Sequence, residues 1–588
     1  MMPLLQGRTF NVHLILLLTV VFCLPALFSG LLGDDYIHYA LLSPDIAIPK
    51  AHDWSVFGLF SWIDADPTRN RVLMNLGVIP WWTDPSMRYE FWRPLAELSH
   101  WLDYQLWRDH PWLMHLHSLL WYLGLGWALF RLYLRTGMEK PAVLLGLAVF
   151  MLDSTHGLTI SWIANRNALM AGVFGVLCLL SFIQWREQAR NRALASSLVW
   201  LTASLFSGEI GVSTLCYLGA YALLVDRKGP TKALLALWPY MILCVAWWML
   251  YRAGHFGATN SDVNYIDPVA NPWMFVKMAF ERGPVLLFSE FGIVPAEIYG
   301  FAGHPLPAYI AVALFFILAL IWLLYPLLAS SPLARFWALG TCLSLGPIST
   351  TVPADRNLLM VGIGASALLG LLFQQLQEAI RLPRSRRYGI RTLIAVHLVL
   401  SPLLLPLTSY GPHLWSKLMR LDLARQMPVA STTESELVFG LPMPIALGAN
   451  PMRFADALPV AENTWLISSL KQNFILTRID ADTLRVTSKK GMIDSIESVL
   501  RNLKKSPIKP GFHVELNGLM LTVTKLNATG HPTELALHFT PERLASSHII
   551  AWTGQHFERK EIPQIGEQLA LNLAPPPSNP EPVNVATR

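Results

Sequence analysis

The chain has 588 residues, of which 53% are hydrophobic and only 14% are charged, and its mean hydropathy is +0.40. Soluble proteins carry roughly 25% charged residues, so this composition excludes a soluble enzyme, a coiled coil and a disordered scaffold. The net charge of +6 comes from Lys and Arg residues that flank apolar segments, which is typical of membrane proteins and does not indicate nucleic-acid binding. The sequence therefore predicts a multi-pass α-helical membrane protein.

Eleven segments are apolar enough to cross a bilayer, which takes about 20 residues, or a few fewer inside a bundle. They are residues 12–32, 113–133, 141–157, 167–184, 193–207, 209–225, 232–251, 307–328, 334–350, 358–375 and 391–410. The length of the first predicts a retained signal anchor rather than a cleaved signal peptide. The apolar stretch 284–299 contains Glu290 and Glu297 and is predicted to be re-entrant or interfacial. A count of twelve or thirteen spans stays open.

Basic residues gather in four segments between the predicted spans, at 131–140, 186–192, 227–232 and 381–391. Short loops rich in Lys and Arg stay in the cytoplasm, so these segments place the N-terminus inside. The first outer loop, 33–112, holds eight of the 22 Trp residues. Because Trp favours the headgroup layer, this loop is predicted to lie on the membrane as amphipathic helices, notably over 93–108.

After the last span the sequence becomes less apolar and shows short strand patterns. Strands are predicted at 474–479, 484–487, 513–516, 519–525 and 534–539. Asn517-Gly518 is typical of a two-residue hairpin turn, and 492–503 of a short amphipathic helix. The predicted organisation is a transmembrane core at 1–410, a mostly β extracytoplasmic domain at 411–573 and a disordered Pro-rich tail at 574–588.

Ionisable residues at the outer ends of the spans form the candidate site, because charged groups are costly near lipid. Asp34 and Asp35 follow the first span directly. Two adjacent carboxylates repel each other, and one of them can acquire the raised pKa that a general base requires; a hydrated helix end is the alternative. Arg93, Arg166 and Arg356 lie in other outer loops, where a guanidinium either pairs with a carboxylate or clamps a phosphate.

The same loops resemble a known family. The segment that runs from Tyr89 through Trp92-Arg93-Pro94 to Leu120 is similar to the first-loop signature of polytopic GT-C glycosyltransferases. Within that superfamily it resembles the tetratricopeptide-carrying transmembrane O-mannosyltransferases and their bacterial relatives. Further motifs that match this group are Asp34-Asp35 after the first span, Trp162, Arg166 and Leu169 at the start of a later span, and Asp355-Arg356-Asn357-Leu358 near the end of the core.

The resemblance covers roughly residues 10–375 and has departures. Gly208 stands where the group has Lys before Glu209, and Asn357 stands where it has Tyr. No 34-residue helical repeat follows the core, so the acceptor of the repeat-bearing members cannot be carried over.

The resemblance implies an inverting glycosyltransferase of the GT-C type, which moves a sugar from a polyprenyl-phosphate-linked donor to an acceptor outside the cytoplasm. The residues it implies are Asp34 and Asp35 for catalysis, Arg93, Arg166 and Arg356 for the donor phosphate, and His38, Glu97, Glu209 and Asp355 in support. Asp34 is favoured as the base, while Asp35 orients it, binds sugar or helps to hold a divalent metal. Acceptors implied by the resemblance are a protein, a lipid or a glycan.

Two other functions stay open. One is a transporter or flippase of a lipid-linked sugar, although the charges lie at span ends rather than at mid-membrane. The other is a non-catalytic scaffold whose β domain binds a partner. The expected location is a bacterial inner membrane, with the C-terminal domain in the periplasm.

Overall fold

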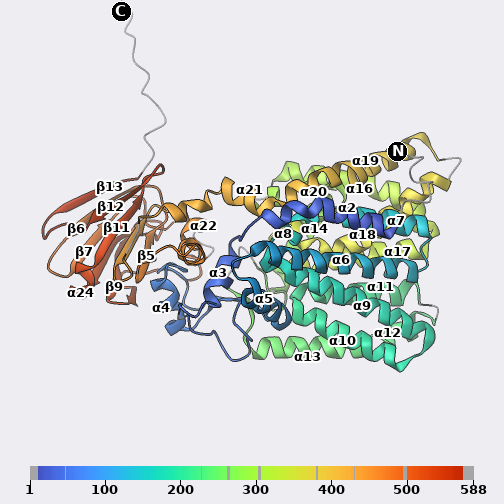
Figure 1. Cartoon of the computed structure of the whole chain (residues 1–588), viewed down its shortest axis with the longest axis horizontal. Helices are drawn as coiled ribbons and strands as arrows, with labels where there is room; N and C mark the ends of the chain where they lie inside the picture. Colours follow the sequence, from blue (N-terminus) through green and yellow to red (C-terminus); the bar gives the residue numbers. More distant parts are fainter. Residues whose placement is uncertain are drawn as a thin grey trace, which may run out of the picture.

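The computed structural model describes residues 11–573 apart from 47, 227, 261–264, 302–305, 379–381, 429–430 and 494–499. A helical bundle, a middle layer of short elements and a β-rich domain succeed one another along the longest axis of the molecule (Figure 1). The predicted tail, 574–588, lies outside the described residues.

Most bundle helices overlap the eleven apolar segments expected from the sequence, except that the short helix Gly157–Ser161 lies almost wholly beyond the segment 141–157. They are α2 (Val12–Cys23), α6 (Pro111–Arg135), α7 (Lys140–Met151), α8 (Gly157–Ser161), α9 (Arg166–Gln188), α10 (Asn191–Ser207), α11 (Ser213–Leu224), α12 (Pro230–Leu235), α13 (Trp238–Ala253), α16 (Pro307–Ser330), α17 (Pro332–Ile348), α18 (Leu359–Glu378), α19 (Arg384–Ala395) and α20 (Ser401–Ser409). Several begin with Pro in the first turn, where its missing N–H costs no hydrogen bond.

Six described helices are long and apolar enough to cross a membrane, or seven if the pair Lys140–Met151 and Ser154–Ser161, bent by 42°, is one span. The six are Pro111–Arg135, Ile163–Gln188, Pro230–Ala253, Pro307–Ser330, Leu359–Leu376 and Arg384–Ser409. Val12–Phe28 and Glu209–Leu224 are apolar but shorter. The chain is therefore a multi-pass membrane protein, whereas the predicted number of eleven crossings is not confirmed.

Three of the four basic segments meet at the end of the bundle that lies away from α3 (Asp34–Leu41) (Figure 1). Arg135 forms an ion pair with Glu187, and Arg186 forms one with Asp226. These pairs join the α6–α7, α9–α10 and α11–α12 connections. The basic loops thus share one end of the bundle, as positive-inside sorting requires.

The outer loops build the middle layer. Its helices are α3, α4 (Pro67–Asn75), α5 (Pro94–Trp107), α15 (Glu297–Phe301) and α21 (Gly411–Leu418). Helix α14 (Pro272–Gly292) instead lies in the bundle, where it packs on α16, α17 and α18 (Figure 1). Helix α5 confirms that the segment predicted at 93–108 is helical; its predicted position on the membrane stays a prediction. Three short antiparallel strands, in the order β1-β2-β3, join two of the outer loops: β1 (Ser61–Asp64), β2 (Arg88–Glu90) and β3 (Gly257–Thr259).

The C-terminal domain contains two sheets. A six-stranded antiparallel sheet has the order β13-β6-β7-β10-β9-β8, from β6 (Asn473–Arg478), β7 (Thr483–Thr487), β8 (His513–Leu516), β9 (Leu519–Leu526), β10 (Pro532–Phe539) and β13 (Gln568–Asn572). A four-stranded mixed sheet has the order β12-β11-β4-β5, from β4 (Ser435–Phe439), β5 (Asn463–Ser468), β11 (Ser547–Trp552) and β12 (Phe557–Glu561). Short helices α22 (Met443–Ala446) and α23 (Ala449–Ala455) connect the parallel strands β4 and β5, and α24 (Pro541–Ala545) precedes β11.

All five predicted strands are present, and the Asn517-Gly518 turn pairs Leu516 with Leu519, with Gly518 at φ +74°. The mixed sheet was not predicted, because its strands β4 and β5 are buried at every position and lack the alternation of a half-exposed strand. The centre of the predicted helix at 492–503, residues 494–499, lies outside the described residues, and the described residues at its two ends are not helical.

The domain and the middle layer share a hydrophobic core. Trp81 and Trp82 of the first outer loop pack with Leu437, Trp465 and other domain residues. The Trp81 indole donates to the Ile467 carbonyl (3.1 Å), and the Trp465 indole donates to the side chain of Asn75 (2.9 Å). The domain is thus fixed onto the outer loops and is not tethered by the chain alone.

Candidate active site

A cavity of about 1150 Å³ lies between the bundle, the middle layer and the C-terminal domain. Polar side chains from several outer loops line it, among them Asp34, Tyr89, Arg93, Asn165, Asn167, Glu209, Tyr251 and Arg356. These residues are far apart in the sequence, and the ends of the bundle helices bring them together. The expectation that the outer ends of the spans form one site is therefore met in part, because some of the predicted residues line this cavity and others do not.

Asp34 lies in the first turn of α3 and lines the cavity. Burial raises the pKa of its carboxyl to about 6, while the positive charges of Arg356 and Arg93 lower it. Within the described part of the chain, no cation lies at ion-pair distance from Asp34, so its oxygens can meet a substrate hydroxyl. A carboxylate with a pKa near 6 is mostly ionised at neutral pH and accepts protons better than an ordinary Asp.

Asp35, the next residue, has different surroundings. Its side chain is fully buried, and its two oxygens accept the backbone N–H groups of Leu32 (3.0 Å) and Ala164 (2.7 Å). Burial raises the pKa of Asp35 to about 8, and these two N–H groups oppose the rise. Asp35 is not among the described residues that line the cavity. It joins α3 to the turn before α9, whereas the sequence predicts a catalytic role for it.

Arg93 lines the cavity, but a carboxylate already holds it. Its Nε and Nη2 lie 2.8 Å from Glu209 Oε2, and its guanidinium covers the rings of Phe60 and Phe91. Glu209 also accepts a hydrogen bond from the Tyr251 hydroxyl (3.2 Å). Burial tends to lower the pKa of Arg93, but Glu209 raises it overall. The pair is therefore a fixed, neutralised part of the wall.

Arg356 lines the cavity next to Trp162, whose ring lies 4.5 Å from the guanidinium carbon. Among the residues that the structure describes, no carboxylate lies at ion-pair distance from Arg356. Stacking on the indole holds the guanidinium in place while leaving its N–H groups available. Arg356 is thus the cavity arginine most suited to bind an anion.

The structure does not place Arg166, predicted to contact a donor phosphate, at the cavity. Its side chain is fully buried, does not line the cavity and forms an ion pair with the equally buried Asp103. It also donates to Ser118 Oγ (3.0 Å), Ser99 Oγ (3.1 Å) and the Met114 carbonyl (2.7 Å). An arginine with these partners connects α5, α6 and α9.

Three of the four supporting residues also lie outside the cavity lining. His38 is enclosed by Phe60, Trp62 and His100, and burial lowers its pKa to about 3. Glu97 accepts hydrogen bonds from the Ser55 hydroxyl (3.0 Å) and the Phe57 N–H (2.8 Å). Asp355 accepts from the Ser289 hydroxyl (2.6 Å) and the Ala296 N–H (2.8 Å), which fixes the turn that carries Arg356.

Two asparagines that flank Arg166 belong to the site although the sequence motifs did not indicate them. Asn165 and Asn167 line the cavity, and the Asn165 Nδ2 and Asn167 Oδ1 atoms are buried without a hydrogen-bond partner among the described residues. The 3₁₀ turn Ile163–Asn165 before α9 directs these neighbours differently from Arg166. Unpaired buried amides are costly, so both are candidates to bind a polar substrate. The sequence pattern singles out the charge of Arg166 and not the two neighbouring amides.

The adjacent Asp34 and Asp35 do not fit the divalent metal that the resemblance allowed. Asp35 has both oxygens engaged by backbone N–H groups, so it has little capacity left for an ion. Among the described residues, no group of three or more His, Cys, Asp or Glu side chains is arranged to hold a metal. No step of the mechanism is therefore assigned to a metal.

Compared with known proteins, the chain matches no family model and no curated protein sequence. Among solved structures it is similar to ArnT from Cupriavidus metallidurans bound to undecaprenyl phosphate, with 13% identity and a TM-score of 0.40 over 90% of this chain and 98% of that one. It is also similar to the Archaeoglobus fulgidus oligosaccharyltransferase, in the apo form (11% identity, TM-score 0.39) and tethered with an acceptor peptide (10% identity, TM-score 0.36).

The match to the oligosaccharyltransferase covers 78% of this chain and 65% of the archaeal protein, so this chain spans less than two thirds of its length.

Proposed function

We propose that this protein is a membrane glycosyltransferase that moves a sugar from a polyprenyl-phosphate-linked donor to an acceptor hydroxyl outside the cytoplasm. The observation that carries the proposal is that Asp34, which has no ionic partner within the described chain, shares one cavity with an arginine that likewise lacks one, Arg356. Transfer from a lipid phosphate needs a base for the hydroxyl and a cation for the leaving group.

The charges of the cavity favour a monophosphate carrier. Arg93 is neutralised by Glu209, and Arg252 is paired with Asp267 at 2.9 Å. Arg69 is paired with Asp64 at 3.4 Å, so Arg356 is the cation left for the substrate among the described residues of the lining. One positive charge matches the single negative charge of a sugar phosphodiester. The Asn165 amide N–H is a further donor for a phosphate oxygen or a sugar hydroxyl.

In the proposed reaction, the acceptor oxygen attacks the anomeric carbon of the sugar, opposite the phosphate. A C–O bond forms to the acceptor, and the bond between the anomeric carbon and the phosphate oxygen breaks. The polyprenyl phosphate leaves with the electron pair beside Arg356, and the hydroxyl proton passes to Asp34. Attack from the opposite side inverts the configuration of the anomeric carbon.

The experiment is a transfer assay with Asp34→Asn in lipid nanodiscs, which measures the release of undecaprenyl phosphate from a mixed pool of undecaprenyl-phosphate-linked sugars. Removing a general base costs about 10²–10⁴ in rate, and binding of undecaprenyl phosphate should be retained. Asp45→Asn is the matched control, since Asp45 is exposed and outside the cavity. Equal turnover of the two variants would remove Asp34 from the role of base.

A further inference from the structure

The cavity extends beyond its polar residues along two apolar walls. The first, the membrane-facing arm, is lined by Met241, Val245, Trp248 and Phe275. The second, the domain-facing arm, is lined by Ile63, Leu73, Val78, Leu447, Pro451 and Leu500. The C-terminal domain and the bundle lie on opposite sides of α3 (Figure 1), so a substrate at Asp34 has an apolar wall on either side.

The membrane-facing arm suits the hydrocarbon chain of the carrier. Met241, Val245 and Trp248 belong to the apolar span Pro230–Ala253 and are 51%, 50% and 41% exposed. Side chains that are apolar and half exposed on a membrane-spanning helix face lipid. A polyprenyl chain can therefore reach this arm from the bilayer without crossing water.

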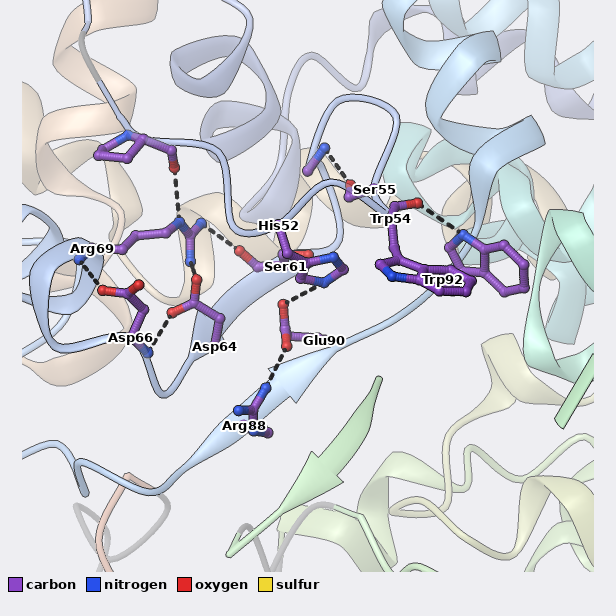
Figure 2. Close-up of polar contacts among 12 residues, drawn as sticks. His52, Trp54, Ser55, Ser61, Asp64, Asp66, Arg69, Arg88, Glu90 and Trp92 are labelled. Carbon is purple, nitrogen blue, oxygen red and sulfur yellow. Dashed lines mark hydrogen bonds and ion pairs between the residues drawn. The ribbon is translucent and has the colours of Figure 1, made fainter. Parts of the chain in front are cut away.

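The domain-facing arm is formed by the outer loop and the C-terminal domain. Arg69 is the charged side chain among the described residues of this arm, and its own contacts satisfy it. Figure 2 shows its guanidinium beside Asp64 (3.4 Å), with hydrogen bonds to the carbonyls of Ser61 (2.6 Å) and Pro49 (3.0 Å). The neighbouring buried Glu90 is similarly engaged, by His52 and Arg88. The described residues of this arm therefore offer a ligand apolar surface and no free charge.

The arm is a built feature and not a gap between loosely joined parts. Helix α23, which carries Pro451, packs on α3. The Asn450 amide donates to the Leu76 carbonyl (2.9 Å) and to Thr464 Oγ1 (2.8 Å). The Arg425 guanidinium reaches the Tyr36 hydroxyl on α3 (3.4 Å). These contacts hold the outer loop and the C-terminal domain, which form the two sides of this arm, against α3.

We infer that the domain-facing arm binds the apolar part of the acceptor, so that the acceptor is an amphiphile whose hydroxyl-bearing head group meets Asp34. This inference rests on the proposed function. A free saccharide or a charged peptide would lose its hydration in this arm without gaining polar partners, whereas an alkyl or acyl chain gains by leaving water. The carrier already has the arm that opens to lipid, which leaves this one for the acceptor.

A photolabelling experiment tests the inference without knowledge of the donor sugar. The full-length protein in nanodiscs is labelled with n-decyl β-glucoside that carries a diazirine in its alkyl chain, and the labelled residues are mapped by mass spectrometry. Label is expected on segments 61–79 and 443–451. Unlabelled decyl glucoside should displace it, while undecaprenyl phosphate and methyl glucoside should not.

Variants provide the control. Leu447→Arg and Leu447→Trp should each reduce labelling by about tenfold or more, because one places a charge in the arm and the other fills it. Ile475→Arg should leave labelling unchanged, since Ile475 lies outside the cavity lining and is 43% exposed on the outward face of β6. Thermal unfolding confirms that each variant is folded.

Three results would overturn the inference. Displacement by undecaprenyl phosphate would assign the arm to the carrier, and displacement by methyl glucoside would assign binding to the head group alone. Equal labelling of the Leu447 and Ile475 variants would place the probe elsewhere. None of these outcomes touches the proposed function, which fails separately if undecaprenyl phosphate does not bind or Asp34→Asn stays active.

Discussion

Asp34 and Asp35 show how one residue step changes the role of a carboxyl group. Successive side chains on a helix point about 100° apart, so α3 directs Asp34 to the cavity and Asp35 toward the turn before α9. Asp34 is exposed to two arginines across the cavity, and Asp35 is held by two backbone N–H groups. The sequence predicts an acidic pair with a perturbed pKa, but two adjacent letters do not tell which one faces the substrate.

The pH dependence of transfer should report on Asp34. The base works in its ionised form, so kcat/KM should rise with pH through about 6 and then level off. Arg356 lowers the pKa of Asp34, so Arg356→Gln should move the rising limb of the pH profile to higher pH. The measured quantity is the pH at which kcat/KM rises. The plateau value of kcat/KM is not used, because the loss of a phosphate ligand also lowers it.

Arg420→Gln is the matched control for this titration. Arg420 also rests on an indole, that of Trp552, at 5.5 Å, but it is not among the charges that act on Asp34. In Arg420→Gln, the rising limb of kcat/KM should stay at the same pH as in the unsubstituted protein. A limb that does not move in Arg356→Gln would mean that the titrating group is not Asp34.

Arg166 and its neighbours mark the limit of reading a site from charge. Arg166 is ion-paired with Asp103 and donates hydrogen bonds to Ser99 and Ser118. The cavity is bordered instead by its neighbours Asn165 and Asn167. The signal that was available is the polar face of 93–108, where Ser99 and Asp103 are four residues apart. That face is buried against α6 and α9, whereas an amphipathic surface helix would turn it to water.

At the scale of elements, hydropathy located most of the described bundle helices, because about 20 apolar residues in lipid have to satisfy their backbone within one helix. It could not locate the breaks inside them. The bend between α7 and α8 at Asp153, and the π-helical turn Val396–Leu400 before α20, depend on contacts with other helices. Ser401, for example, accepts the Ser154 N–H at 2.7 Å.

Helices α7 and α18 pack closely through Gly146 and Gly370, so a larger side chain at this contact should destabilise the protein. A Cβ on Gly370 would collide with the Ala142 carbonyl and lie 2.7 Å from the Gly146 nitrogen. Gly370→Ala should therefore force the helices apart and cost about 1–3 kcal/mol, seen as a lower Tm in detergent. Gly124→Ala, on α6, meets no atom within 4 Å and should leave the Tm unchanged or slightly raised. Equal Tm values would mean that this contact does not limit stability.

At the scale of the whole molecule, the sequence predicts the order of the parts but not how they join. The boundary near residue 410 and the β-rich character of the C-terminal domain are local properties of composition. The cavity that contains Asp34 is also lined by Leu447, Pro451 and Leu500 of the domain, which is a long-range contact. In sequence, such apolar residues cannot be distinguished from those of the domain core. The role of the domain as a wall of the site therefore emerged only from the packing of α23 on α3.

The orientation of the molecule in the membrane can be tested with two cysteines in a variant that lacks the five native ones. Ile475→Cys places a thiol on the outward face of β6, and Arg384→Cys places one at the start of the basic helix α19; both positions are exposed. A membrane-impermeant maleimide added to intact cells should label position 475, and it should label position 384 only after permeabilisation. The physical reason is that basic segments resist translocation, while the transfer site needs to face the compartment of the acceptor. The reverse pattern would place Asp34 in the cytoplasm and contradict the proposed direction of transfer, whereas labelling of both positions from outside would mean that Arg384–Ser409 does not cross the membrane.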